Sequence, residues 1–356
     1  MRLVPVLLLL GCTPAPNDPP ADTSEVTPTP DATPTRDFVR VAGDPAPDPV
    51  TERLCVTPDE DAPDFDPVRV PCDDVTWRFA PDDPDPPNGP IQVMAFNVER
   101  GRSLDAILAA FDGGALPTPD VLLLSELDRG CPRTGGRDVT GELASALGMD
   151  GIFVVEFVEL PRGPSAQGQA PCEHGNAILS RFPLGNARRV LHEQNLSWYQ
   201  PPDDRLGGEP RLGGRALAVA DAAIGDDLLR LVSLHFESTP ASWDEVLPAQ
   251  ALESALEGLA PGGPAIVGGD TNFPVYSFDL GRDDGDIRDR GAAAFLDRGY
   301  EDAHAALPVS ERGTRGGLII DLIFGVEVTL SSPGVCARSL CDDLSDHQAV
   351  WAGVAW

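Results

Sequence analysis

The sequence predicts mixed β-sheets packed together with helices on the outside, and it argues against a doubly wound parallel sheet. Two observations in the part of the chain after residue 90 support this prediction. Apolar stretches of strand length outnumber stretches with helical periodicity. Several of these strand candidates follow one another across short turns, whereas parallel strands need long crossover connections. At 356 residues, the chain is long enough for one large domain or two small ones.

Three segments have the apolar spacing of helices. Residues 103–111 follow this spacing behind Ser103, a residue type that caps helices. Residues 141–148 predict a short helix that ends at Gly148, and residues 247–260 predict an amphipathic helix closed by a Pro-Gly-Gly sequence. The predicted strands are 91–98, 120–127, 175–184, 215–224, 228–236, 264–270, 316–325 and 347–356.

The chain is strongly acidic, with a formal net charge of -31 from 57 Asp and Glu residues against 26 Lys and Arg residues. The sequence contains no lysine, so every strongly basic side chain is an arginine. Such a surface repels polyanions and most anionic membranes. Binding of DNA through overall charge is therefore not expected, although a local arginine patch or a metal ion could offset the repulsion.

The first twelve residues, MRLVPVLLLLGC, place one arginine before a short apolar run and a Gly-Cys pair. The run is too short to cross a bilayer as a helix. It resembles a bacterial lipoprotein signal, with Cys12 as the lipidated residue. This resemblance implies a protein exported and lipid-anchored to the bacterial cell envelope, at the outer membrane or surface. A cleaved signal peptide with secretion, or a misplaced start, is the alternative.

Composition divides the rest of the chain into three segments. Residues 13–50 are dense in Pro, Asp, Thr and Ala and are expected to be a disordered tether after the signal at 1–12. Residues 51–88 hold two cysteines and are expected to be a small disulfide-tied extension packed on the main domain. Residues 89–356 form the predicted main domain.

Six cysteines remain after Cys12, and an even number in an exported chain suggests disulfides. The sequence leaves the connectivity open, and pairing of nearest neighbours is our prediction. The expected pairs are Cys55–Cys72, Cys131–Cys172 and Cys336–Cys341. A zinc site is disfavoured because no CxxC pair occurs.

Polar residues follow most of the apolar runs, where side chains from packed sheets can meet in one cleft. A carboxylate inside LIIDLIF, Asp321, is costly to bury unless it is paired, and His347 is a natural partner. The other candidates are each weak alone, since strand-end charges, turn residues and core histidines are common. These candidates are Asn97, Glu126, Asn176, Arg215, His235, Asp270, Asn272 and Asp346.

Taken in order, the segments FNVER, SELD, GNAILSR, GGRAL, SLHFES, GGDTN, IDLIF and SDH resemble the endonuclease/exonuclease/phosphatase family. The resemblance covers roughly Ile91 to Trp356. It implies an α+β four-layer sandwich, in which two mixed sheets pack face to face with helices outside. It also implies hydrolysis of phosphoester bonds.

The resemblance implies a role for each candidate. Glu126 would be the principal metal carboxylate with Asn97 beside it, and Asp346 would join directly or through water. His347, oriented by Asp321, would face the scissile phosphate. The other implied roles are positioning of water and phosphate by Asp270 and Asn272, a phosphate contact by His235, and substrate contacts by Asn176 and Arg215. Mg²⁺ is the expected ion, because it takes few carboxylates and keeps its waters, and Mn²⁺ or Ca²⁺ are alternatives.

We therefore expect an exported, metal-dependent phosphodiesterase of nuclease type, acting as a monomer and touching the membrane only through its anchor. The alternatives are a phospholipid or inositol-phosphate phosphatase on the same fold, and a binding protein that has lost catalysis. Residues 278–291, rich in aspartate, are expected to be a solvated acidic loop rather than a Ca²⁺ site, because their spacing differs from the EF-hand pattern.

Overall fold

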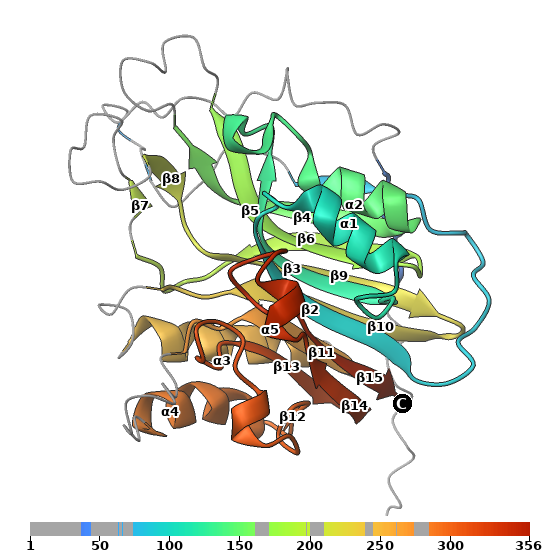
Figure 1. Ribbon diagram of the computed structural model, residues 1–356. Helices are drawn as coiled ribbons and strands as arrows, with labels where there is room; N and C mark the ends of the chain where they lie inside the picture. Colours follow the sequence, from blue (N-terminus) through green and yellow to red (C-terminus); the bar gives the residue numbers. More distant parts are fainter. Residues whose placement is uncertain are drawn as a thin grey trace, which may run out of the picture. The chain divides into compact units, whose positions relative to one another are not determined.

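Two β-sheets form the centre of the protein (Figure 1). Within the described residues, the larger sheet has nine strands in the order β14-β15-β2-β3-β5-β4-β8-β7, with β1 beside β4. These strands are β1 Val75–Trp77, β2 Ile91–Arg100, β3 Val121–Arg129, β4 Asp150–Glu159, β5 Cys172–Ser180, β7 Trp198–Tyr199, β8 Arg211–Gly213, β14 Thr329–Val335 and β15 Val350–Ala355. The pair β2–β3 is parallel, and the other pairs of this sheet are antiparallel.

The smaller sheet is also mixed. Its described strands follow the order β12-β13-β11-β10-β9-β6. They are β6 Leu184–Leu191, β9 Ala216–Ile224, β10 Asp227–His235, β11 Ala265–Asp270, β12 Glu301–Asp302 and β13 Asp321–Val326. Only β10 and β11 run parallel among these described pairs. The predicted mixed sheets are therefore confirmed.

The structure is a computed structural model that describes residues 37–43, 63, 66, 74–160, 171–196, 198–199, 210–238, 245–260, 262–273 and 285–356. All of these residues belong to one unit, Thr35–Trp356. No helix in these ranges is both long and apolar enough to cross a membrane.

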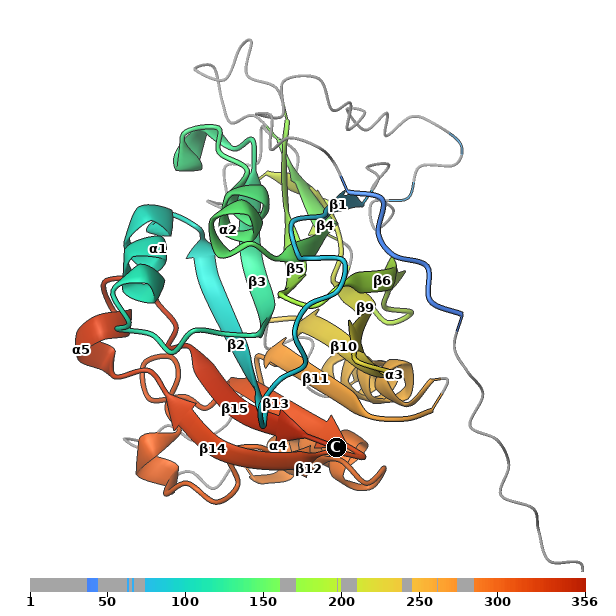
Figure 2. The same cartoon turned by 90° about the vertical axis from the view of Figure 1, so that its right-hand side faces the viewer.

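Helices cover the outer faces of both sheets, as the two views show (Figures 1 and 2). The helices α1 Leu104–Asp112, α2 Val139–Leu147 and α5 Arg338–Cys341 belong to the side of the larger sheet, and α3 Val246–Leu259 and α4 Gly285–Leu296 to the side of the smaller one. Short 3₁₀ turns lie at Pro132–Thr134 and Val309–Glu311.

Three clusters of buried apolar residues fill the three interfaces between the four layers. Strand β2 shows the alternation that builds them, because Val93 and Ala95 face the smaller sheet while Met94 and Phe96 face the outer helices. A third cluster joins the smaller sheet to α3 and α4. The result is the four-layer α/β/β/α sandwich that the sequence predicted.

Three observations concern segments that the sequence analysis predicted. Residues 37–43 fall in the predicted tether, yet Val41 is buried and Arg40 pairs with the buried Asp150, because apolar and basic residues interrupt the polar composition there. Strand β1, from the predicted extension, pairs with β4 and so belongs to the larger sheet. Helix α4 occupies part of the predicted acidic loop. The limits of the signal and of the domains stay predictions.

Two of the three predicted cysteine pairs are present at disulfide distance. Cys131 and Cys172 are joined with an S–S distance of 2.07 Å, and Cys336 and Cys341 with one of 2.18 Å. Cys12 and the predicted pair Cys55–Cys72 lie outside the described residues.

Candidate active site

Strand register brings three of the predicted residues into one row across the smaller sheet. His235 at the end of β10 pairs with Asp270 at the end of β11, and Asp270 pairs with Asp321 at the start of β13. In the larger sheet, the parallel strands β2 and β3 place Asn97 beside Ser125, one residue before Glu126. Side chains from both sheets therefore meet at one end of the sandwich.

Irregular backbone geometry sets the direction in which site side chains of the larger sheet point. Register shifts interrupt the pairing of β3 with β5 between Leu124 and Leu127, and Glu126 within this bulge has a φ of 56°. A bulge changes the direction in which a side chain points, and positive φ is uncommon for residues other than glycine. Asn272, in the turn after β11, also has positive φ, at 47°. Strained backbone of this kind is frequent at functional sites.

The amide of Asn97 links the carboxylates of the two sheets. Its Nδ2 donates to Glu126 Oε1 at 3.2 Å and to Asp270 Oδ2 at 3.0 Å, and Asn97 is fully buried. Burial alone would raise the pKa of Glu126, but the imidazoles of His235 and His174, the Arg100 charge and the Asn97 hydrogen bond together lower it. Glu126 is therefore ionised at neutral pH.

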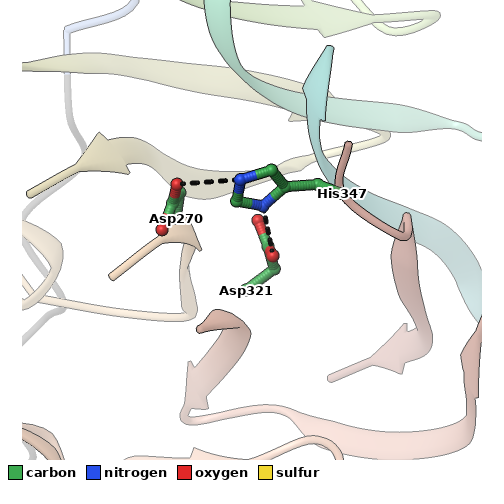
Figure 3. Close-up of side chains that lie close together, drawn as sticks. All are labelled: Asp270, Asp321 and His347. Atoms are coloured by element: carbon green, nitrogen blue, oxygen red, sulfur yellow. Dashed lines mark hydrogen bonds and ion pairs between the residues drawn. The ribbon is translucent and has the colours of Figure 1, made fainter. Parts of the chain in front are cut away.

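Asp321 and His347 form the predicted pair (Figure 3). His347 Nδ1 donates to Asp321 Oδ2 at 2.8 Å, and both side chains are buried. Burial lowers the pKa of His347, yet the charges of Asp321, Asp270 and Asp346 outweigh it and raise the value to about 9. The other ring nitrogen, Nε2, lies 3.7 Å from Asp270 Oδ2. His347 thus faces Asp270 as a cation.

His235 is held by a different partner on the other side of Asp270. Arg215 Nη1 donates to His235 Nδ1 at 2.7 Å, and the same nitrogen donates to Glu156 Oε2 at 3.2 Å. The second ring nitrogen, Nε2, lies 3.5 Å from Asp270 Oδ2 and 3.9 Å from Glu126 Oε1. Since a guanidinium has no acceptor, Nδ1 of His235 must accept this bond, and the ring proton belongs on Nε2.

Glu156 is a site residue that the sequence analysis missed. It is fully buried in a bulge of β4, and it accepts from the Ala216 backbone N–H at 3.1 Å as well as from Arg215. Burial raises the pKa of Glu156, but the charge of Arg215 and the neighbouring His235 outweigh it and lower the value. The signal in the sequence was a carboxylate inside the apolar run IFVVEFV, the same signal that identified Asp321.

The turn after β11 fixes Asp270. The backbone N–H of Asn272 donates to Asp270 Oδ1 at 2.9 Å, and Asn272 Nδ2 donates to the Phe236 carbonyl at 3.0 Å. Before it, Gly269 has a φ of 142°, and a Cβ there would lie 2.1 Å from the Leu234 carbonyl oxygen. Only glycine allows β10 and β11 to approach so closely at this point.

The remaining predicted residues lie around this centre. Asp346 is half-exposed, with Oδ2 2.7 Å from Arg315 Nη2 and Oδ1 3.9 Å from His347 Nε2. Asn176 is buried and donates to the Ala216 carbonyl at 3.0 Å, which joins the two sheets. Arg215 is buried against Glu156 and His235 instead of lying open to a substrate, so its predicted substrate contact has no support in this arrangement.

The carboxylates that converge at this end of the sandwich are oxygen ligands of the kind that a hard divalent cation takes. Asn97 presents its Nδ2 to them, because its Oδ1 accepts from the Glu99 backbone N–H at 3.1 Å. Within the described residues, two places qualify: the carboxylate of Glu126, with Asn97 beside it, and the group of Asp270, Asp321 and His347, whose donor atoms lie within 4.8 Å of one another. In the second group His347 is held as a cation, and a protonated imidazole does not bind a metal. The first place is therefore the better ligand set.

Carboxylates and imidazoles therefore meet at one end of a four-layer sandwich. The chain belongs to the Endonuclease/Exonuclease/phosphatase family, whose profile matches residues 94–347. Members of this family hydrolyse phosphoester bonds and generally depend on divalent metals, which supports a phosphoesterase or nuclease-type function here.

Solved structures with the same fold share little sequence with this chain. An endonuclease/exonuclease/phosphatase from Beutenbergia cavernae is 18% identical, with 75% of this chain and 72% of that chain covered and a TM-score of 0.50. The 3' phosphatase NExo from Neisseria, bound to a product DNA hairpin, is 18% identical, with 75% and 100% covered and a TM-score of 0.50. A search of curated proteins gives no match.

Proposed function

We propose that the protein is a metal-dependent phosphodiesterase of nuclease type, which hydrolyses its substrate by metal-assisted attack of water on phosphorus. The observation that carries the proposal is the row His235–Asp270–Asp321, which faces Asn97 and Glu126 of the other sheet and contacts His347 at 3.7 Å. Such a site brings together a place for a cation, a carboxylate that can accept a proton, and two imidazoles that can donate hydrogen bonds.

The proposed metal ligands are Glu126 and Asn97, with Asp346 at the edge, and Mg²⁺ is the proposed ion. The ionised state of Glu126 suits a hard cation. When bound, the ion would neutralise the phosphate and stabilise the leaving oxygen. Glu126 and Asp270 share the amide of Asn97, so the structure already brings negative charges together where a cation is expected.

The proposed general base is Asp270. His235 carries its proton on Nε2 because Arg215 occupies Nδ1, and His347 is cationic, so both imidazoles present N–H groups. These nitrogens lie 3.5 Å and 3.7 Å from Asp270 Oδ2. The only one of these three groups that can accept a proton is the carboxylate. Water would give its proton to Asp270 as its oxygen bonds to phosphorus and the ester oxygen leaves.

His347 and His235 would serve as donors to the phosphate. The Asp321 bond fixes the orientation of His347 and holds its charge beside the site, where an anionic transition state gains the most from it. His235 would donate from Nε2, because its Nδ1 is occupied by Arg215. Asn272 would position the base through its backbone N–H.

We also propose that the chain is exported and lipid-anchored through Cys12. The support is the lipoprotein-like start, together with two cysteine pairs at disulfide distance, which persist mainly in oxidising compartments. Mass spectrometry of the amino terminus, with Cys12→Ser as the control, tests this. An intact Met1 in the mature protein contradicts it.

The test of catalysis is hydrolysis of bis-p-nitrophenyl phosphate by the full chain with Mg²⁺, Mn²⁺ or EDTA. We expect activity that EDTA abolishes and that Asp270→Asn lacks. Metal-independent hydrolysis, or full activity in Asp270→Asn, contradicts the proposal. A panel of DNA, RNA, sphingomyelin and inositol phosphates then tests the substrate class, and preference for the last two rejects a nuclease.

A further inference from the structure

A tight hairpin carries Arg315 to the edge of the site. Arg315 and Leu318 exchange backbone hydrogen bonds of 3.2 Å and 2.8 Å, and the residues between them, Gly316 and Gly317, have φ values of 56° and 93°. Two consecutive positive φ values are typical of the turns that close two-residue hairpins, and glycine adopts them without strain. The sequence RGGL therefore fixes where the Arg315 backbone lies.

The hairpin is tied to the two segments that supply Asp321 and His347. Thr314 Oγ1 accepts from the backbone N–H groups of Ile320 at 3.2 Å and Asp321 at 3.1 Å. The Thr314 carbonyl accepts from the Gln348 N–H at 2.7 Å, next to His347. The backbone beneath Arg315 is thus held in place, while its long side chain is about half exposed and can turn.

The guanidinium of Arg315 lies among the carboxylates of the site. Its Nη2 donates to Asp346 Oδ2 at 2.7 Å, with side-chain exposures of 47% and 40%. Burial lowers the pKa of Arg315, but the charge and hydrogen bond of Asp346, together with the charges of Asp270 and Glu126, raise it overall. A half-exposed ion pair of this kind contributes little to stability, so it can exchange partners at small cost.

We propose that Arg315 exchanges Asp346 for the substrate phosphate when a divalent cation binds. This proposal rests on the proposed function, in which Asp346 lies at the edge of the metal site. Without the cation, Arg315 neutralises Asp346. A cation at Asp346 repels the guanidinium and removes its partner, and phosphate oxygens match the planar fork of an arginine. Arg315 thereby couples cation binding to phosphate binding.

The coupling works in both directions, as linkage requires. In the free protein, Arg315 competes with the cation for Asp346 and weakens cation binding. Once the cation is bound, the released Arg315 strengthens phosphate binding. Removal of the guanidinium should therefore tighten one ligand and weaken the other, a pattern that general damage to the site does not produce.

The test compares the full-length wild type with the full-length variant Arg315→Gln. The full-length variant Arg181→Gln is the matched control. Arg181 is also about half exposed, at 43%, and pairs with Asp120 at 2.6 Å beside the start of β3, opposite to the end that carries Glu126. We expect Arg315→Gln to bind Mn²⁺ about tenfold more tightly than the wild type, and to bind inorganic phosphate in saturating Mn²⁺ about tenfold more weakly. Arg181→Gln should match the wild type in both titrations.

The outcomes separate this proposal from the proposed function. If the wild type binds Mn²⁺ and hydrolyses the diester while Arg315→Gln titrates like Arg181→Gln, the role of Arg315 is rejected and the enzyme assignment stands. If the wild type binds no Mn²⁺, both are rejected. Weaker Mn²⁺ binding by Arg315→Gln also rejects the exchange, since it would show that the arginine supports the metal site.

Discussion

The two imidazoles beside Asp270 have similar positions and different partners. His347 donates to a carboxylate, Asp321, at 2.8 Å, whereas His235 accepts from a guanidinium, Arg215, at 2.7 Å. Their second nitrogens lie at nearly equal distances from Asp270 Oδ2, 3.7 Å and 3.5 Å. The partner behind each ring, and not the distance of the ring from the centre, therefore decides whether its Nδ1 donates or accepts a hydrogen bond.

We infer different roles for the two groups that flank Asp270. The first side consists of His347 and Asp321, and the second side of His235, Arg215 and Glu156. The pair of His347 and Asp321 keeps a positive charge at the site, which serves the chemistry of an anionic substrate. The group of His235, Arg215 and Glu156 places a buried ion pair behind the other ring, and such pairs are costly to break. We therefore expect substitutions on the first side to reduce turnover strongly, and substitutions on the second side to reduce stability more than turnover.

The largest expected effect is that of His347→Gln on turnover. Glutamine can donate to Asp321 but carries no charge, so kcat should fall by about 10³-fold while the fold persists. Hydrolysis of the diester in Mg²⁺ measures this, with circular dichroism as the control for folding. His347→Ala is less suitable, because His347 is buried and its loss would leave Asp321 without a donor. Near-normal turnover in the glutamine variant removes His347 from the mechanism.

Glu156→Gln should reverse the balance. It removes the charge of the carboxylate that the buried Arg215 contacts at 3.2 Å, which should lower the free energy of unfolding by about 3 kcal/mol. Its kcat should fall by about tenfold, because His235 keeps its contact with Arg215. Urea denaturation and steady-state hydrolysis measure the two effects. A loss of turnover as large as that of His347→Gln, without a loss of stability, would erase the distinction between the two sides.

The strands and the Asp321–His347 pair could be predicted from the pattern of apolar and polar residues in the sequence. Apolar runs located the sheets, and the carboxylate within LIIDLIF predicted the contact between Asp321 and His347 that the structure contains. The buried side chain had to find a partner, and only five histidines were available. The resemblance supplied the order of the other candidates.

Local irregularities could not be predicted in the same way. Glu156 faces the site because of a bulge in β4, and Arg215 lies behind His235 because two distant strands pack together. Neither follows from alternation of residues along one strand. Helix α4 was missed because its Gly and Asp residues disfavour helix, and packing of its other face against the smaller sheet overrides that propensity.

The charge of His347 should also appear in the pH dependence of stability. The folded pKa of about 9 lies above the ordinary value near 6.5, so the stabilising contribution is complete below pH 6.5 and is lost as the pH rises through 9. At about 1.4 kcal/mol for each pKa unit, the change is roughly 3 kcal/mol. Urea denaturation in EDTA from pH 6 to 10 measures it, and His347→Gln should lack this dependence. A flat profile in the wild type would show that His347 is neutral.

The smallest expected effect concerns the disulfide on the His347 side. Cys336 and Cys341 lie five residues apart, so the pair closes a short loop and should contribute about 2 kcal/mol, less than the pair Cys131–Cys172 with its separation of 41. The loop leads to Ser345, whose Oγ accepts from the His347 N–H at 3.1 Å and donates to the Asn97 carbonyl at 2.7 Å. Neither bond involves a cysteine, so we expect both to persist without the disulfide, and Cys336→Ser with Cys341→Ser should reduce kcat less than Glu156→Gln does. A larger loss would mean that the disulfide, and not Ser345, holds the cationic imidazole in place.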